Sequence, residues 1–351
     1  MLFFKSRLLI SAFFLLPLAI TAHADKDSRY KVTHLVSDVP GIAPLVDPNL
    51  RNPWGIGLNP AGAAFWVSNQ LTGVSTLYVG DVNGSPFAKV PLTVTIPGGN
   101  PTGQVFNGTT SFQVTNGTTS GPGLFITSGL SGMIAGWNPT VAPNTTAKLG
   151  IAVSGAVYTG LAIGNDGVRN LLFAANPVQG TIDVFDSNYM PTAVPGMFAD
   201  PNLTPGLRPF NVQAVQGHLF VTYTNRAMGD VEGNGAVNEF DMNGHLIRRF
   251  TDTDSLVQPW GVTRAPANFG SFSGALLVGN FGDGRIHAFR MSDGKKLGAL
   301  KQNHGGPIEL ERLWDLKFGN GVTAGNSNDL YFTAGIGDEE HGLFGKIELD
   351  E

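Results

Sequence analysis

Aromatic rings and hydrogen-bonding side chains recur in a short motif that appears six times along this 351-residue chain. One position of the motif holds a large ring or a hydroxyl: Trp54, Thr102, Thr159, Phe210, Trp260 and Trp314. One or two residues earlier stand polar residues or a tyrosine: Asn52, Asn100, Tyr158, Arg208, Gln258 and Arg312. Indole rings stack on the apolar faces of sugars, and arginine pairs with carboxylates through two hydrogen bonds.

The two positions together predict a binding site for a sugar or a small anionic ligand. Its candidate residues are Asn52, Trp54, Asn100, Tyr158, Arg208, Phe210, Gln258, Trp260, Arg312 and Trp314. Packing of the same rings between structural units is the alternative. The two hypotheses differ in whether the tryptophan rings point towards a central channel or lie between sheets.

A second group of residues could perform acid–base or metal chemistry. A carboxylate next to a histidine raises the pKa of the imidazole and orients the ring, and the run from Asp338 to His341 offers such a pairing. Weak catalytic candidates are His304, His341, Glu340 and Asp315. Because neighbouring residues on a strand point to opposite faces, a solvated loop is the alternative for 338–341.

Two segments rich in Asp, Asn and Gly, at 229–235 and 280–284, are similar to loops that hold calcium. Their weak candidate ligands are Asp230, Glu232 and Asp283. Neither segment has the twelve-residue EF-hand spacing, and simple hairpin loops are the alternative. Calcium is therefore possible, and no other cofactor is predicted.

The elements that position these residues follow a repeat of about 50 residues. Each motif opens a short apolar run, and a second and a third run rich in Val, Leu and Phe follow, for example 64–67 and 74–79 in the first unit. Pairs such as Asn83-Gly84 and Asp293-Gly294 supply the positive φ angles of tight hairpins, so most units continue into a fourth strand. Four strands at this period predict an all-β, six-bladed β-propeller.

The two ends of the chain are expected to meet in one sheet. The sixth unit ends at Leu349 without its own outer strand, whereas 30–36 reads as a strand with no unit of its own. We expect the N-terminal strand to close the last blade, which protects the open strand edges. Residues 25–351 would then form a single propeller domain.

Residues 1–24 are predicted to be a signal peptide. Lys5 and Arg7 precede an apolar run over 8–20, which is too short to span a bilayer, and Ala22-His23-Ala24 is a typical cleavage pattern. Secretion or periplasmic localisation after cleavage near Ala24 follows, with no membrane span in the mature chain. The chain has no cysteine, which excludes disulfides and thiol nucleophiles, and its net charge of −5 without a basic run argues against nucleic acid partners.

Several motifs resemble an uncharacterised family of secreted bacterial proteins. They are 34–38 (HLVSD), 52–55 (NPWG), 259–261 (PWG), 280–284 (NFGDG) and 341–345 (HGLFG). More distantly, the units are similar to NHL repeats and to the six-bladed gluconolactonase-like propellers. That second resemblance implies metal-binding carboxylates and amides around the channel mouth. However, the motif position that holds a ring or a hydroxyl carries no carboxylate in any of the six units. Only Asp47 and Asp315 lie nearby in sequence.

Three functions fit these observations. The first is binding of a small molecule, a glycan or a protein partner at one face of the ring, without catalysis. The second is a propeller hydrolase or lyase that acts on a lactone or a glycan. The third is a structural component of the envelope or matrix. The sequence leaves open whether the protein is an enzyme.

Overall fold

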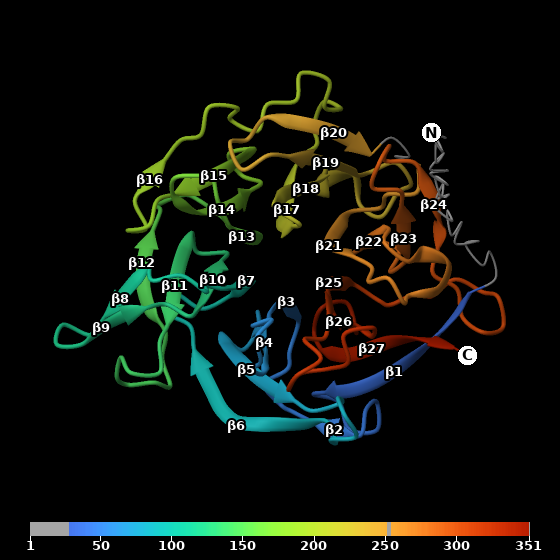
Figure 1. Cartoon of the computed structure of the whole chain (residues 1–351), viewed down its shortest axis with the longest axis horizontal. Coiled ribbons are helices and arrows are strands. Elements are labelled where there is room, and N and C mark those ends of the chain that lie inside the picture. Colours follow the sequence, from blue (N-terminus) through green and yellow to red (C-terminus); the bar gives the residue numbers. More distant parts are fainter. Residues whose placement is uncertain (1–27, 251–253, 351) are drawn as a thin grey trace, which may run out of the picture.

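Six blades, each a sheet of mainly antiparallel strands, surround a central axis in the computed structural model, which describes residues 28–250 and 254–350 (Figure 1). Apart from two short 3-10 turns, η1 (Arg226–Met228) and η2 (Gly270–Phe272), the regular elements of this part are strands. This arrangement confirms the predicted six-bladed β-propeller. The expected signal peptide lies outside the described residues.

Each of the first five blades is one four-stranded sheet. The strands of blades 1 to 3 are β3 (Pro53–Gly57), β4 (Phe65–Asn69), β5 (Val74–Val79) and β6 (Ala88–Thr95); β7 (Pro101–Phe106), β10 (Phe125–Gly129), β11 (Met133–Trp137) and β12 (Lys148–Ala152); and β13 (Gly160–Asn165), β14 (Asn170–Asn176), β15 (Thr181–Phe185) and β16 (Pro191–Thr192). The strands of blades 4 and 5 are β17 (Arg208–Val215), β18 (His218–Thr224), β19 (Ala236–Phe240) and β20 (Leu246–Phe250); and β21 (Pro259–Arg264), β22 (Leu276–Asn280), β23 (Ile286–Phe289) and β24 (Lys296–Ala299).

Blade 6 contains both ends of the described chain. Its sheet has the order β2 (Leu45–Val46), β1 (Arg29–Ser37), β27 (Leu343–Asp350), β26 (Leu330–Ala334) and β25 (Leu313–Phe318). Strand β1 is antiparallel to β27, from Arg29 opposite Asp350 to Ser37 opposite Leu343. The two strands lie side by side in Figure 1, so the predicted closure of the ring is confirmed.

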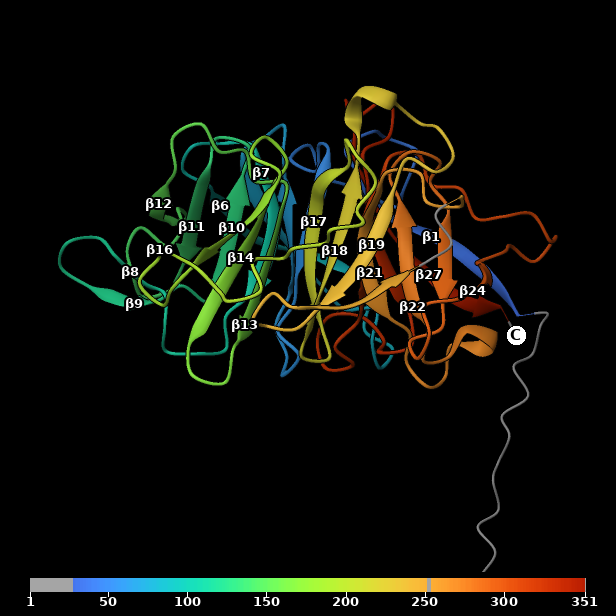
Figure 2. The ribbon, with the colours of Figure 1, turned by 90° about the horizontal axis from the view of Figure 1, so that it is seen from above.

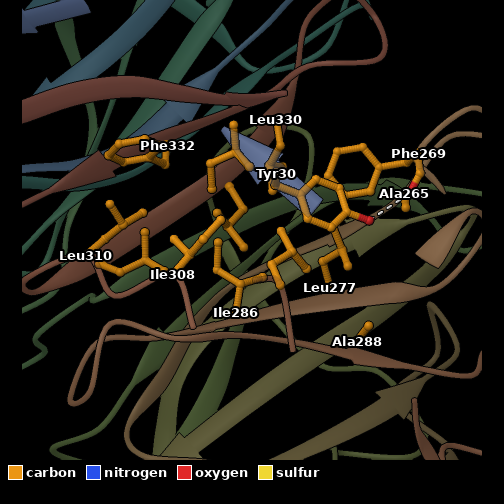
Figure 3. Packing of buried hydrophobic residues seen from close by; sticks show 14 of the residues in the cluster. Tyr30, Ala265, Phe269, Leu277, Ile286, Ala288, Ile308, Leu310, Leu330 and Phe332 are labelled. Carbon is orange, nitrogen blue, oxygen red and sulfur yellow. Dashed lines mark hydrogen bonds between the residues drawn. The ribbon is translucent and has the colours of Figure 1, made fainter. Parts of the chain in front are cut away.

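Tyr30 anchors the closing strand in the core between blades 5 and 6 (Figure 3). Its side chain is fully buried in a cluster with Leu277 and Ile286 of blade 5 and Phe332 of blade 6. The Tyr30 hydroxyl donates a 2.9 Å hydrogen bond to the carbonyl oxygen of Phe269. Burial raises the pKa of this hydroxyl well above its ordinary value, so it remains a donor at any physiological pH.

The inner strands of neighbouring blades approach one another so closely that several positions near the axis have no room for a Cβ atom. A Cβ atom on Gly55 would lie 2.7 Å from the carbonyl oxygen of Thr102 in the next blade. A Cβ atom on Gly103 would overlap the backbone nitrogen of Leu161, in the blade after that. Glycine is therefore required at these positions by the contact between backbones, and we call this part of the axis the narrow level.

The two faces of the ring carry different loops. Figure 2 shows the short turn η1 at the upper edge of the ring and η2 at the lower edge. We call the face that carries η1 the upper face; the loops before each inner strand and after each second strand lie there. None of the helices in 28–250 and 254–350 has the length and hydrophobicity to cross a membrane.

Candidate functional site

Five large aromatic residues meet on the upper side of the narrow level. Trp54, Phe210, Trp260, Phe281 and Trp314 form one buried cluster, although they come from blades 1, 4, 5 and 6. The rings of Trp54 and Trp314 stack with centroids 3.6 Å apart, and Trp260 contacts both of them edge-on. The rings therefore converge on the axis and pack against one another there. One hypothesis had them line a central channel and the other had them lie between sheets, and neither describes this arrangement fully.

Irregular strand pairing directs these rings inward. The pairing register of the inner strands shifts between Pro53 and Ile56 in blade 1 and between Pro259 and Val262 in blade 5. Blade 6 shows the same shift, between Leu313 and Leu316. A β-bulge changes the direction in which a side chain points, so the bulge explains how each tryptophan reaches the axis.

The three indole N–H groups have different partners. Trp314 Nε1 donates to Asn52 Oδ1 at 2.9 Å, and Trp260 Nε1 donates to the carbonyl oxygen of Thr159 at 3.0 Å. Trp54 Nε1 is buried, and it has no acceptor in the part of the chain that the structure describes. A buried donor without an acceptor is costly, and this N–H group is also sealed from solvent.

A cavity of about 310 Å³ opens beside this cluster on the upper face. We call it the mouth cavity; its lining residues are Asn52, Trp54, Gln70, Leu130, Val157, Thr159, Pro177, Phe210, Arg226 and Glu339. Five blades contribute to this wall. Most of the wall is apolar, and a few polar groups stand at the rim, which is the usual composition of a small-molecule site.

Amide groups connect the polar side of the rim. Asn52 Nδ2 donates to Gln70 Oε1 at 3.0 Å and to Glu339 Oε1 at 3.2 Å. Gln70 Nε2 in turn donates to Asn100 Oδ1 at 2.8 Å. Asn52 thus joins the buried Trp314 to the rim, and this network holds the Glu339 carboxyl group in place.

Glu339 is an acid in unusual surroundings. Burial raises the pKa of its carboxyl group, while the hydrogen bond from Asn52 and the charges of Arg226 and Arg312 oppose the rise. The backbone of Asp338 and Glu339 has φ angles of 55° and 71°, a left-handed conformation that non-glycine residues rarely adopt. Such strain occurs preferentially at functional sites.

Arg226 is the cation of the mouth cavity. Its guanidinium carbon lies 5.3 Å from the ring centre of Phe210 and 5.1 Å from that of Phe281. Across 28–250 and 254–350, no side chain or carbonyl forms a hydrogen bond or an ion pair with this guanidinium. The rings therefore hold the positive charge while its N–H groups stay available.

Arg312 contrasts with Arg226, although it also lies over the ring of Phe281. Arg312 Nη1 pairs with Asp230 at 2.7 Å, and Nη2 pairs with Asp338 at 3.0 Å. Two carboxylates thus neutralise Arg312. An incoming anion would find its partner in Arg226.

The structure brings only part of the predicted binding set to the cavity. Asn52, Trp54 and Phe210 line it. Five further candidates contact residues of the cavity wall or their neighbours: Asn100, Gln258, Trp260, Arg312 and Trp314. Gln258 does so through Asp230, to which its Nε2 donates a hydrogen bond. Tyr158 donates to Asp183 at 3.0 Å and Arg208 lies beside Gly180, so neither lines the mouth cavity.

The residues that follow the second strand of each blade were not among the candidates predicted from the sequence. Gln70, Leu130 and Pro177 stand directly after β4, β10 and β14. Arg226 and Glu339 belong to the corresponding loops of blades 4 and 6. For Gln70, Leu130 and Pro177 the repeat itself was a usable signal, because each directly follows a second strand, whereas Arg226 and Glu339 lie two and five residues beyond theirs.

The catalytic candidates do not converge. Strand β1 begins beside Gln302, near His304, and ends beside Leu343, near His341, so the two histidines lie at opposite ends of that strand. His341 Nδ1 contacts Asp38 Oδ2 at 2.8 Å. The two histidines therefore do not form one site.

The other two catalytic candidates also have structural partners. Glu340 pairs with Arg51 at 3.4 Å on the surface. Asp315 is buried on the axis, where its carboxylate accepts hydrogen bonds from the backbone N–H groups of Ile56 and Leu316 and from Gln213 Nε2. Burial raises the pKa of Asp315, and the three donors stabilise its ionised form.

The calcium candidates are engaged in other contacts. Asp230 binds Gln258 and Arg312, and Asp283 accepts from Asn280 Nδ2 and from the backbone N–H of Arg285. Glu232 lines a separate shallow pocket with Asp283. Within 28–250 and 254–350, no three His, Asp or Glu side chains are grouped so that they could hold a metal ion.

The sequence is similar to uncharacterised viral proteins. One protein of Acanthamoeba polyphaga mimivirus is 32% identical over 340 residues, which cover 92% of this chain and 81% of the relative. A second mimivirus protein is 30% identical over 342 residues, with coverage of 92% and 87%. The chain belongs to their family. These relatives are viral, whereas the resemblance in the sequence led us to expect a bacterial family, and no model of a known protein family matches the sequence.

Solved structures confirm the propeller fold of this family member. A protein of unknown function from Bacteroides thetaiotaomicron aligns with a TM-score of 0.55 at 10% identity, covering 92% of this chain and 77% of the other. The PQQ-bound form of aldose sugar dehydrogenase from Streptomyces coelicolor aligns with a TM-score of 0.51 at 13% identity, covering 92% and 99%. At these identities the likeness concerns the fold alone.

Proposed function

We propose that this protein binds a small organic anion in the mouth cavity. The observation that supports the proposal most directly is the guanidinium of Arg226, which two aromatic rings hold at the cavity wall without a hydrogen-bonding partner in the described part of the chain. Arginine binds a carboxylate with two parallel, charge-assisted hydrogen bonds. The anion would supply the missing partner.

The wall of the cavity favours a ligand with an apolar body. Trp54, Phe210, Leu130, Val157 and Pro177 offer rings and aliphatic groups to one side of such a molecule. A volume of about 310 Å³ lies at the small end of the range of ligand pockets, so the ligand has the size of a single ring with its substituents.

Titration with matched ligands tests the proposal. Benzoate and benzamide share size and shape, but only benzoate carries a charge. We expect benzoate to quench tryptophan fluorescence and to give a calorimetric binding isotherm, with benzamide at least about tenfold weaker. Equal affinity for the two, or no binding of either, contradicts the proposal.

A pair of variants locates the site. Arg226→Gln should reduce the affinity for benzoate about tenfold or more, because it removes the charge while retaining much of the side chain. Arg264→Gln is the control, since Arg264 is exposed at the far end of an inner strand and its side chain, among the described residues, donates only to the carbonyl oxygen of Gly274. Unchanged affinity in Arg226→Gln would place the site elsewhere.

We further propose that the mature chain is exported. The proposal is supported by the basic residues, the apolar run and the Ala22-His23-Ala24 pattern within residues 1–24. Expression of the full chain in a bacterial host, followed by fractionation and N-terminal sequencing, should give a periplasmic product that begins at Asp25. A cytoplasmic product that begins at Met1 would contradict export.

A further inference from the structure

The mouth cavity contains a free acceptor as well as a free cation. Glu339 Oε1 accepts from Asn52, whereas Oε2 has no hydrogen bond with the described residues and is not sealed from solvent. Arg226 offers donors to the same cavity. A ligand that satisfies both residues needs an acceptor for Arg226 and a donor for Glu339.

The position of Glu339 is imposed by its loop. The backbone N–H of Asp338 donates to Glu311 Oε1 at 2.9 Å, and that of Glu339 donates to the carbonyl oxygen of Gly335 at 2.8 Å. These bonds hold two successive non-glycine residues in the left-handed conformation. The fold thus keeps the backbone in an unfavourable conformation, and this conformation places the carboxyl group of Glu339 at the rim of an apolar cavity.

The charge around Glu339 indicates which donor it binds. Asp230 and Asp338 neutralise Arg312, so Arg226 is the guanidinium acting on this carboxyl group that has no ion pair in the described residues. An ammonium group on the ligand would be repelled by Arg226, whereas a hydroxyl group donates to a carboxylate without adding charge. The hydroxyl is therefore the better partner.

We infer that the ligand of the mouth cavity is a sugar acid, that is, a hydroxylated ring of monosaccharide size that carries a carboxylate. Its carboxylate binds Arg226, a ring hydroxyl donates to Glu339, and the C–H face of the ring packs against the aromatic wall. This inference rests on the proposed function, which requires the carboxylate but not the hydroxyl groups.

Glucuronate and cyclohexanecarboxylate are the two ligands that test the inference. Both carry a carboxylate on a six-membered ring, but only glucuronate has hydroxyl groups. We expect calorimetry with the full mature chain to show at least about tenfold tighter binding of glucuronate. If both bind with similar affinity, the sugar-acid inference fails and the anion proposal stands. If neither binds, both fail.

Variants of Glu339 test whether this residue causes the preference for glucuronate over cyclohexanecarboxylate. Glu339→Gln keeps the shape of the side chain and places a donor where the acceptor was, so it should remove most of the preference for glucuronate and leave cyclohexanecarboxylate almost unaffected. Glu309→Gln is the matched control, because Glu309 pairs with Arg285 on the surface and does not line the cavity. A preference that survives in Glu339→Gln overturns the inference.

Two further ligands separate the contribution of the carboxylate from that of the hydroxyl groups. Glucose lacks the carboxylate and should bind at least about tenfold more weakly than glucuronate. Phenylalanine offers a carboxylate, an apolar ring and an ammonium group in place of hydroxyls. Tighter binding of phenylalanine than of glucuronate would show that Glu339 selects a cation, and it would overturn the assignment of a sugar acid.

Discussion

Gln213 and Asp315 are joined across the ring by a hydrogen bond of 2.7 Å between Gln213 Nε2 and Asp315 Oδ1. Asp315 also accepts from the backbone N–H groups of Ile56 and Leu316, so one buried carboxylate connects blades 1, 4 and 6 at the axis. Asp315→Ala would leave three donors without an acceptor. We expect it to lower the free energy of unfolding by about 3 kcal/mol or more, measured by denaturant titration.

The pH dependence of stability tests the same residue. Burial raises the pKa of Asp315 above its ordinary value of 3.8. In the window above 3.8, up to the higher pKa of the folded protein, the folded chain retains a proton that the unfolded chain has released. The free energy of unfolding contributed by Asp315 therefore falls as pH rises through this window. Asp315→Asn should lack this decrease, and an unchanged pH profile would contradict it.

Glycine at the narrow level of the axis should be irreplaceable. Gly103→Ala places a methyl group against the backbone of Leu161 and Gly160, neither of which can move without shifting a strand. Overpacking of this kind costs about 1–3 kcal/mol, which should appear as a lower Tm. Gly306→Ala is the control, because the nearest atom to its added methyl group would be 3.6 Å away in the His304 ring. Similar Tm values for both variants would contradict the close approach of the strands.

Ring closure depends on the N-terminal strand. Tyr30→Ala removes a fully buried ring from the core between blades 5 and 6 and should cost about 3–5 kcal/mol. Tyr30→Phe removes only the hydrogen bond to Phe269 and should cost about 1 kcal/mol. Denaturant unfolding of the two variants separates packing from hydrogen bonding. A small effect of Tyr30→Ala would show that the closing strand adds little stability.

The fold was predictable because its information is local and repeated. Turn pairs such as Asn83-Gly84, with φ angles of 52° and 77°, mark hairpins without knowledge of distant residues. The spacing of 57 residues between Gly103 and Gly160 is explained by an inserted hairpin, β8 (Gln113–Thr115) and β9 (Ser120–Pro122), which the repeat did not reveal. The fourth strand of blade 3, β16, has only two residues, which is too short for a hydrophobic pattern to mark it in the sequence.

The site was only half predictable because its chemistry depends on contacts between blades. The motif before each inner strand was visible, so Asn52, Trp54 and Phe210 were found. Arg226 and Glu339 stand in loops of different length and composition, and no local pattern relates them. They share one cavity only because the ring closes, which a reading of separate repeats does not show.

Lys346 should stabilise blade 6 at neutral pH. Its ammonium group pairs with Asp81, Asp329 and Glu348 at 2.9–3.1 Å, with only 12% of its side chain exposed. These carboxylates raise the pKa of Lys346. Lys346→Met leaves Asp81 and Asp329 without a cation among the described residues and should cost about 3 kcal/mol at pH 7 in denaturant unfolding.

The cost of Lys346→Met should shrink towards pH 4, because the unpaired carboxylates take up protons. Lys31→Met is the matched control. Lys31 also pairs with Glu348, at 3.1 Å, but 60% of its side chain is exposed, so its loss should cost less than about 1 kcal/mol. Equal losses in the two variants would contradict the role of burial.

Binding of a sugar acid should depend on the protonation of Glu339. Burial raises the pKa of this carboxyl group above its ordinary value of 4.5, and only the ionised form accepts a hydroxyl hydrogen through both oxygens. The affinity for glucuronate should therefore fall as pH decreases through the raised pKa of Glu339, before the carboxylate of the ligand itself is protonated. Calorimetry between pH 4 and pH 7.5 measures this loss. Glu339→Gln, which cannot titrate, should bind weakly at every pH in this range, and a wild-type affinity that is constant down to pH 4.5 would show that Glu339 does not contact the ligand.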